Sequence, residues 1–373
     1  MGTGEARLAI DCGSASTVAV LAWPDGTSAP LMFDGQPALP SAVFLAPDGN
    51  LLTGQRAWQG AATQPDRFIP APRRSPEQQL TVAGTEVEAL DVVAATLRRV
   101  ADEAQRTAGF PIEDVRLVVP AGWGPRRRTW MRHAAHRAGL AQPRLVEAPV
   151  AVAQHLVACG VQLPVGSFVV VCDVGAGAEV SVLRRGPVGF EVLATLADPG
   201  AGGTAIDHAL TTILTGGEGT STAGEGERWA LAASVQAAKH ALTDHPAVTV
   251  PLPAGPAAVV NGQMLEQAAR PVLCRAAQLT TEAITAAEVD PGSIAGVYCA
   301  GGAAQMPLLE KVFIENAGVA PVMVADPALA AARGAADAGG INPGADVPVA
   351  EPPPVPPVRR AVAIAVPGFA SLG

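Results

Sequence analysis

Two aspartates, Asp11 and Asp173, occupy the same place in two short segments that repeat each other. Residues 11–21 and 173–183 align without a gap, and both read Asp-x-Gly, four further residues, then Val-x-Val-Leu. In each copy an apolar run leads into the aspartate and small residues follow it, which predicts a β-hairpin with a glycine-rich turn. Small residues let backbone N–H groups approach phosphate oxygens closely.

Two carboxylates beside a polyphosphate repel each other unless a divalent cation lies between them. Mg²⁺ held through water molecules is the usual solution. The repeated turns therefore predict a metal–nucleotide site that contains Asp11 and Asp173. The alternative is that each aspartate only caps its own turn.

A second repeated block extends the duplication. Residues 117–149 and 297–327 both contain an apolar run that ends in small residues, then a helical stretch, then a run that ends in an acidic residue close to a proline. Both blocks recur in the same order and at nearly the same spacing, which predicts two homologous α/β halves.

The hydrophobic periodicity predicts alternating strands and helices, and hence parallel crossovers. In the first half we expect strands near 7–10, 17–23, 30–33, 42–45, 116–120 and 144–147, with helices near 91–107, 126–138 and 149–158. In the second half we expect strands near 168–172, 180–184 and 190–196, with helices near 204–214, 227–243, 261–288, 307–316 and 327–338. Residues 24–26 and 47–49, both Pro-Asp-Gly, are typical of hairpin turns.

Composition excludes several classes of protein. The 373 residues carry 25 Lys and Arg against 34 Asp and Glu, a net charge of −9, which disfavours a nucleic-acid partner. A hydrophobic content of 49% excludes disorder of the whole chain. The scattered cysteines and the polar N-terminus, which does not resemble a secretory signal, favour a cytoplasmic location. Lysine is nearly absent while Ala, Pro and Gly are abundant, which suggests a bacterial genome of high GC content.

The periodic pattern stops at Asn342. Residues 351–358 are rich in proline and predict an extended linker, and two arginines then precede the apolar residues 361–373. This apolar run is too short to span a bilayer. Two interpretations stay open: a disordered tail, or part of an anchor that tethers the protein to the inner face of the membrane.

Beyond these patterns, the chain resembles the actin-like ATPase superfamily, and most closely the nucleotide-binding domain of the 70-kDa heat-shock (DnaK-type) chaperone family. The resemblance covers about residues 6 to 340. Its motifs follow in family order at residues 9–16, 40–44, 54–57, 118–121, 128–140, 147–153, 173–177, 202–203, 238–243, 301–307 and 334–336. It implies a duplicated, two-lobed α/β fold of two ribonuclease-H-like halves around a nucleotide cleft. The expected domains are lobe I (1–160), lobe II (161–325), a helix returning to lobe I (326–341) and a proline-rich linker with an apolar tail (342–373).

The resemblance also implies a set of site residues for ATP or ADP with Mg²⁺. Asp11 and Asp173 match the aspartates of the Mg²⁺ shell, Glu147 matches the glutamate that helps to place the attacking water, and Arg73 falls near the family's catalytic lysine. The residues implied to hold the nucleotide are Gly13, Ser14, Ala15, Gly175, Ala176, Gly177, Gly202, Gly203, Lys239, His240, Gly301, Gly302 and Ala303. Glu147 could instead be a solvated helix cap, and Lys239 an exposed helix residue.

Several side chains depart from the family pattern. Arginine replaces the catalytic lysine, and Ala15 and Ala178 replace residues with hydroxyl groups. In the adenosine region Gln236, His240, Ala303 and Gln305 stand where the family has Glu, Arg, Ser and Arg, and Ala328 replaces an aspartate. These departures predict a nucleotide-dependent switch or scaffold with weak or absent ATPase activity, and with a protein partner that the sequence does not identify.

Three alternatives remain open at this stage. They are an active ATPase that uses Arg73 or Arg74, a phosphotransferase of the same fold, and a membrane-associated assembly protein of the actin-like superfamily.

Overall fold

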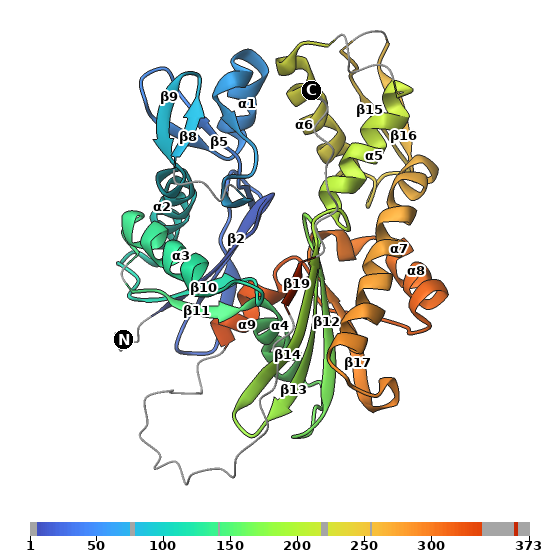
Figure 1. Cartoon of the computed structure of the whole chain (residues 1–373). Coiled ribbons are helices and arrows are strands. Elements are labelled where there is room, and N and C mark those ends of the chain that lie inside the picture. Colours follow the sequence, from blue (N-terminus) through green and yellow to red (C-terminus); the bar gives the residue numbers. More distant parts are fainter. Residues whose placement is uncertain are drawn as a thin grey trace.

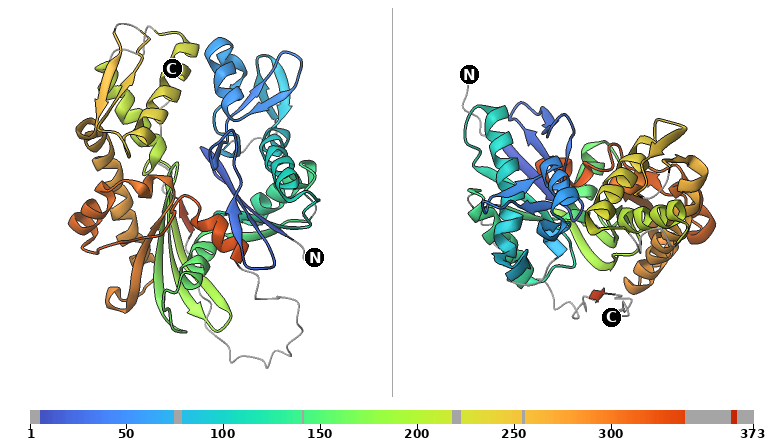
Figure 2. Two further views of the ribbon diagram at one scale, coloured as in Figure 1. Left: turned by 180° about the vertical axis from the view of Figure 1, so that it is seen from behind. Right: turned by 90° about the horizontal axis from the view of Figure 1, so that it is seen from above.

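The computed structural model of the chain describes residues 6–74, 79–140, 142–217, 223–253, 256–337 and 362–364. Figure 1 shows two lobes side by side, joined at their base, and the rear view in Figure 2 shows the same arrangement. The central sheet of lobe I has the strand order β11-β10-β1-β2-β3, with β4 also paired to β2, and that of lobe II has the order β18-β17-β12-β13-β14-β19. This is the duplicated actin-like fold expected from the sequence.

The elements of lobe I are as follows. Its strands are β1 (Arg7–Cys12), β2 (Ser16–Ala22), β3 (Ser28–Pro30), β4 (Ala38–Pro40), β5 (Val43–Leu45), β6 (Leu51–Thr53), β7 (Phe68–Ile69), β8 (Gln79–Val82), β9 (Thr85–Glu88), β10 (Asp114–Val119) and β11 (Arg144–Glu147). Its helices are α1 (Gln55–Thr63), α2 (Ala89–Ala108), α3 (Pro125–Arg137) and α4 (Ala148–Ala158), with short 3-10 turns η1 (Pro65–Arg67) and η2 (Pro72–Arg74).

Lobe II and the returning segment follow. The strands are β12 (Phe168–Val174), β13 (Ala178–Gly186), β14 (Gly189–Asp198), β15 (Ala247–Val250), β16 (Ala258–Asn261), β17 (Ile294–Ala300), β18 (Val322–Met323) and β19 (Val362–Ile364). The helices are α5 (Gly203–Thr215), α6 (Glu225–Ala241), α7 (Gly262–Ala286), α8 (Leu308–Ala317) and α9 (Ala330–Asp337), with 3-10 turns η3 (Pro291–Ser293) and η4 (Gly302–Gln305).

The two halves are built in the same way around their aspartates. β1 and β2 form an antiparallel hairpin, as do β12 and β13. A parallel strand lies on the other side of each aspartate strand, with Asp11 opposite Val118 of β10 and Asp173 opposite Ala300 of β17. The predicted glycine-rich hairpins and parallel crossovers are therefore confirmed.

Helix α9 follows lobe II in the sequence but packs on α4 and on the strands of lobe I. The two helices can approach because position 334 is glycine: a Cβ there would collide with the carbonyl oxygen of Ala151. Arg7 and Arg116 donate to the carbonyl oxygens of Ala336 and Ala335 at 2.6 and 3.2 Å, where cations stabilise the end of a helix.

Some elements differ from the predictions. The predicted strand near 30–33 is instead Ser28–Pro30, because the hairpin turn at Pro24-Asp-Gly26 brings β3 into pairing with the end of β2. Helix α1, the β8–β9 and β15–β16 hairpins and strand β17 were absent from the predicted elements. These segments are short or apolar on both sides, so periodicity alone does not identify them.

Three residues of the C-terminal tail can be described, and they do not decide between the two interpretations. Residues 362–364 form β19, which lies parallel to β14 with Thr195 opposite Val362 and Ala197 opposite Ile364. The rest of the tail, including the linker and the arginine pair, lies outside the described residues. Within the described part of the chain, no helix is both long and apolar enough to cross a membrane.

Candidate functional site

A cleft of about 1040 Å³ lies between the lobes and is lined by residues of both. The two repeated turns lie in it together. Of the predicted site residues, only Gly202 and Glu147 fall outside its lining; the members that line it are Asp11, Gly13, Ser14, Ala15, Arg73, Asp173, Gly175, Ala176, Gly177, Gly203, Lys239, His240, Gly301, Gly302 and Ala303.

The first turn, between β1 and β2, is fixed by Ser41. The Ser41 hydroxyl donates to the carbonyl oxygen of Gly13 at 2.9 Å, and the Ser41 N–H donates to that of Ala15 at 2.9 Å. Gly13 has no room for a side chain, because a Cβ would collide with the carbonyl oxygen of Ser16. The turn is therefore held before any ligand binds.

The second turn, between β12 and β13, packs against the start of α5. The N–H groups of Gly203 and Thr204 donate to the carbonyl oxygens of Gly175 and Ala176 at 2.8 and 3.1 Å. A Cβ on Gly202 would lie 2.5 Å from Gly177 Cα. Gly202 thus does not line the cleft itself, but its lack of a side chain allows the second turn to pack against the start of α5.

Asp11 and Asp173 are the penultimate residues of equivalent strands and are both half-buried at the cleft. Burial, together with the charges of Asp11 and Glu179, raises the pKa of Asp173 to about 7. Burial also raises the pKa of Asp11, and the nearby Arg73 guanidinium opposes that rise. Two half-buried carboxylates, one of which opposes the ionisation of the other, fit a divalent cation between them.

Gly301 completes the surroundings of Asp173. Its φ of 88° favours glycine, and its N–H donates to the carbonyl oxygen of Pro327 at 2.8 Å. A Cβ at this position would collide with the Asp173 carboxylate. Within the described residues no group of three or more His, Cys, Asp or Glu side chains is arranged to hold a metal. An ion here would therefore take its remaining ligands from water and phosphate.

Glu179 is a cleft residue that the sequence reasoning did not select. It lies directly opposite Asp173 in the β12–β13 pair and accepts a hydrogen bond from the Ala121 N–H at 3.1 Å. Burial raises its pKa to about 7. The available signal was a single acidic residue beside the second turn, at the start of a strand whose next residues are mostly apolar.

Glu147 is the N-cap residue of α4 but makes no capping hydrogen bond. Its carboxylate instead pairs with Arg128 at 2.6 Å. The same guanidinium donates to the carbonyl oxygens of Trp123 and Ala121 at 2.7 and 3.3 Å. Glu147 is therefore neither a solvated cap nor a residue of the cleft lining.

Lys239 is not an exposed helix residue, since only 9% of its side chain is exposed. Its ammonium group pairs with Asp207 at 2.8 Å and donates to the carbonyl oxygen of Gly203 at 3.1 Å. Burial lowers the pKa of the neighbouring His240, and the Lys239 charge lowers it further. His240 is thus a neutral cleft residue at pH 7.

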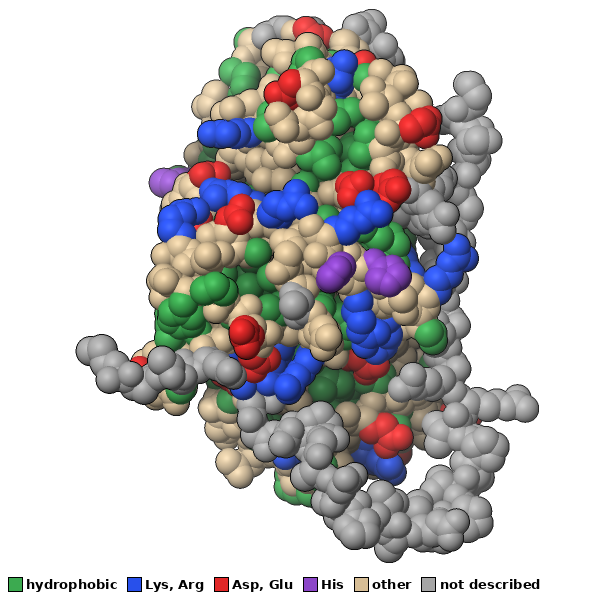
Figure 3. Space-filling view, turned by 90° about the vertical axis from the view of Figure 1, so that its left-hand side faces the viewer, with side chains coloured by type: hydrophobic (Ala, Val, Ile, Leu, Met, Phe, Trp, Pro, Cys, Tyr) green, Lys and Arg blue, Asp and Glu red, His purple; other side chains and the backbone are tan. Residues whose placement is uncertain are grey.

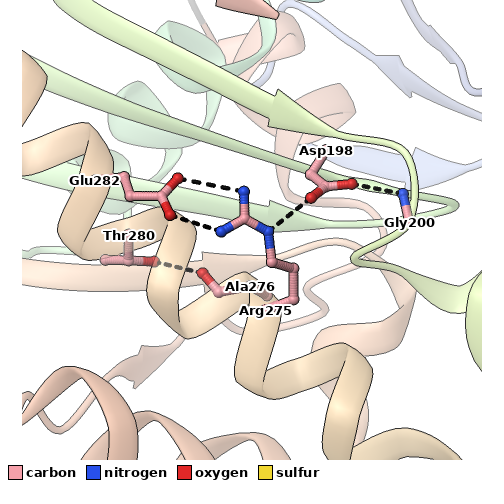
Figure 4. A network of polar contacts seen from close by, with 6 residues as sticks. All are labelled: Asp198, Gly200, Arg275, Ala276, Thr280 and Glu282. Carbon is pink, nitrogen blue, oxygen red and sulfur yellow. Dashed lines mark hydrogen bonds and ion pairs between the residues drawn. The ribbon is translucent and has the colours of Figure 1, made fainter. Parts of the chain in front are cut away.

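Asp198, at the end of β14, also lines the cleft and was not predicted. Figure 4 shows its carboxylate between the Gly200 N–H, at 2.8 Å, and the Arg275 guanidinium, at 2.8 Å. Arg275 also pairs with Glu282 on its own helix at 2.6 Å. This network ties the loop before α5 to α7.

Comparison with known proteins agrees with this geometry. The Hsp70 protein family model matches residues 65–351. The chain is 28% identical over 334 residues to a chaperone protein HscA homolog of Bordetella petrii, covering 81% of this chain and 53% of that protein. It is 30% identical over 290 residues to a chaperone protein HscA homolog of Burkholderia multivorans, covering 76% and 46%.

It is also 26% identical over 359 residues to chaperone protein DnaK of Cenarchaeum symbiosum, covering 91% of this chain and 53% of that protein. The chain thus spans about half the length of the curated relatives it matches. The extent of the family match, the duplicated fold and the paired turns together place the chain in the Hsp70 family, as a chaperone-like nucleotide-binding domain.

Proposed function

We propose that this domain binds ATP or ADP with Mg²⁺ in the cleft and acts as a nucleotide-dependent switch or scaffold with weak or absent hydrolysis. The observation that carries the proposal is the pair of fixed, glycine-lined turns whose half-buried aspartates lie in one cleft. Backbone turns of this kind bind phosphates without help from long side chains.

In this proposal each group has a separate role. Residues 13–15 and 175–177 bind the phosphates, and Asp11 and Asp173 hold the Mg²⁺ shell. The bound ion would neutralise charge on the phosphates and on the two carboxylates. Lys239, His240 and residues 301–303 contact the nucleoside side of the ligand. The lobe boundaries at residues 160 and 325 belong to the same proposal.

Weak hydrolysis follows from two features of the described residues. The Glu147 carboxylate is already engaged by Arg128, so it is poorly available to orient a water molecule. Ala15 and Ala178 cannot supply hydroxyl donors. Loss of one preorganised donor typically lowers a rate by about 10²–10³, although such losses are not additive.

One contact favours the alternative of an active ATPase. Arg73 donates from Nη2 to the Ser14 hydroxyl at 3.3 Å, so its guanidinium lies at the first phosphate turn. An arginine there could stabilise charge that develops on a transferring phosphoryl group. In that case Arg73→Ala abolishes phosphate release, whereas Arg73→Lys preserves a cation at this turn.

The deciding experiment is calorimetric titration with ATP, with and without Mg²⁺, followed by phosphate release from the same sample. Mg²⁺-dependent binding without release supports the switch. Binding with release that depends on Arg73 supports the ATPase. Absence of binding contradicts both, and leaves a fold used purely as a scaffold for a protein partner.

A further inference from the structure

Three arginines of lobe I line the cleft wall, and two of them lie against a single indole. Arg73 and Arg74 come from η2, and Arg127 comes from the first turn of α3. The guanidinium carbons of Arg73 and Arg127 lie 5.2 and 4.8 Å from the centre of the Trp123 ring, within cation–π distance. Arg127 also donates to the carbonyl oxygen of Arg73 at 3.4 Å. The indole thus holds two guanidinium groups close together.

Burial raises the pKa of the three cleft carboxylates Asp11, Asp173 and Glu179, and the charge of Arg73 opposes that rise, but Arg73 forms no ion pair with any of them. Burial lowers the pKa of Arg74 and of Arg127, and the charge of Arg73 lowers each further. Among the described residues, no carboxylate lies within ion-pair distance of the three guanidinium groups, whereas Arg128 on the same helix pairs with Glu147. The guanidinium groups stay charged at neutral pH, so they repel one another across the cleft wall.

The outer face of lobe I contrasts with this wall. Figure 3 shows its Lys and Arg side chains interspersed with Asp and Glu. Arg137, for example, pairs with Glu88 and Asp91 at 2.7 and 2.6 Å. Surplus positive charge is therefore a local property of the cleft wall in a chain whose net charge is −9.

The wall begins where the phosphate turn ends. Arg73 contacts Ser14 of the first turn, and the exposed Arg74 and Arg127 line the same cleft. An anion bound to these groups would therefore lie next to the phosphates that the proposed function assigns to the first turn. Planar guanidinium groups pair well with the oxygens of phosphate, and several of them together suit a chain of phosphates better than one carboxylate.

We propose that Arg73, Arg74, Trp123 and Arg127 form a polyphosphate-binding extension of the nucleotide site. Its ligand is a phosphate chain that reaches past the third phosphate of ATP. The chain is either linked to a nucleoside or supplied as free inorganic polyphosphate. The nucleoside-linked form rests on the proposed function, because the turns must hold the first phosphates.

The test compares three ligands by calorimetry in the presence of Mg²⁺: ATP, adenosine 5′-tetraphosphate and inorganic tripolyphosphate. We expect the tetraphosphate to bind at least about tenfold more tightly than ATP, since it adds charge-assisted hydrogen bonds. Arg127→Gln should remove that advantage and change ATP affinity by less than about twofold. Arg126→Gln is the matched control, because Arg126 is the preceding exposed arginine of α3 and does not line the cleft.

The outcomes separate the two sources and the two proposals. An advantage of the tetraphosphate that disappears in Arg127→Gln but not in Arg126→Gln supports the nucleoside-linked ligand. Tripolyphosphate binding that needs Arg127 while ATP does not bind supports the free ligand and contradicts the proposed function instead. Equal affinities for ATP and tetraphosphate, with tripolyphosphate binding unchanged by Arg127→Gln, would overturn the inference. Thermal unfolding of each variant checks that it is folded.

Discussion

Without a ligand, the ionised carboxylates of the cleft lower the stability of the folded protein. Asp173 and Glu179 face each other across a β-hairpin, and burial raises the pKa of each to about 7. Between about pH 4 and pH 7 such groups hold more protons in the folded than in the unfolded state, so their contribution to stability is lost as pH rises. A bound cation reverses this balance, because it favours the ionised form. The burial that destabilises the fold without ligand thus increases the free energy gained when a cation binds.

Replacement of Asp173 tests this argument. In the absence of ligand, Asp173→Asn should raise the free energy of unfolding at pH 8 by at least about 1 kcal/mol, since one unit of pKa shift corresponds to about 1.4 kcal/mol. At pH 5 the gain should be much smaller, because the wild-type carboxyl is then protonated. Urea unfolding at both pH values measures the difference, with the exposed Asp102→Asn as control. An equal effect at the two pH values would show that Asp173 ionises normally.

Among the elements, the loop before α5 depends on a distant helix for its position. Arg275 of α7 pairs with Asp198, whose side chain is only 6% exposed. Arg275→Ala leaves this carboxylate with the Gly200 N–H alone, and we expect a loss of about 2–4 kcal/mol in unfolding free energy. Arg184→Ala, which breaks an exposed pair with Glu191, should cost less than about 1 kcal/mol. Adding Asp198→Asn to Arg275→Ala should recover part of the loss, and chemical denaturation measures all three variants against the wild type.

The close packing of α9 on α4 depends on the absence of a Cβ at Gly334. Gly334→Ala introduces a Cβ into the carbonyl group of Ala151, so the helices must separate. We expect a loss of about 1–3 kcal/mol, as in overpacked cores. Gly262→Ala on α7 is the control, because a Cβ there meets no atom within 4 Å and should be neutral or stabilising. Similar melting temperatures for the two variants would contradict this account of the crossing.

Local chemistry explains which elements the sequence predicts. The hairpin turns at residues 24–26 and 47–49 are recognisable because Gly26 and Gly49 adopt φ of 87° and 86°, which favours glycine. The repeated aspartates were identified because each stands beside its own turn. By contrast, the wall of Arg73, Trp123 and Arg127 combines separate segments, and β19 pairs with a strand far away in the chain. Such long-range contacts leave no periodic signal in a single sequence.

At the scale of the whole molecule, the lobes contact each other at both ends of the cleft. At one end α9 returns to lobe I, as Figure 1 shows beside α4. At the other end α1 packs against α6. The two helices are so close that a Cβ added at Gly226 would lie 2.5 Å from the carbonyl oxygen of Ala62. Because α6 also carries Lys239 and His240, a movement at this end changes the wall of the cleft.

An aromatic cluster joins the lobes at the α1–α6 end. The ring of Trp229 lies 4.9 Å from Phe68 and 6.2 Å from Trp58, both of lobe I. Aromatic pairs of this geometry contribute about 0.5–1.5 kcal/mol each beyond burial. If nucleotide leaves only when the lobes part, Trp229→Ala should speed its dissociation by about three- to tenfold.

A chase of bound fluorescent ADP with unlabelled ATP measures this rate. Trp23→Ala is the control, because Trp23 packs on the core of lobe I and takes no part in the aromatic cluster between the lobes. Faster release of ADP from Trp229→Ala, but not from Trp23→Ala, would show that the aromatic cluster slows the separation of the lobes. Equal rates in the two variants and the wild type would mean that nucleotide leaves without separation of α1 and α6.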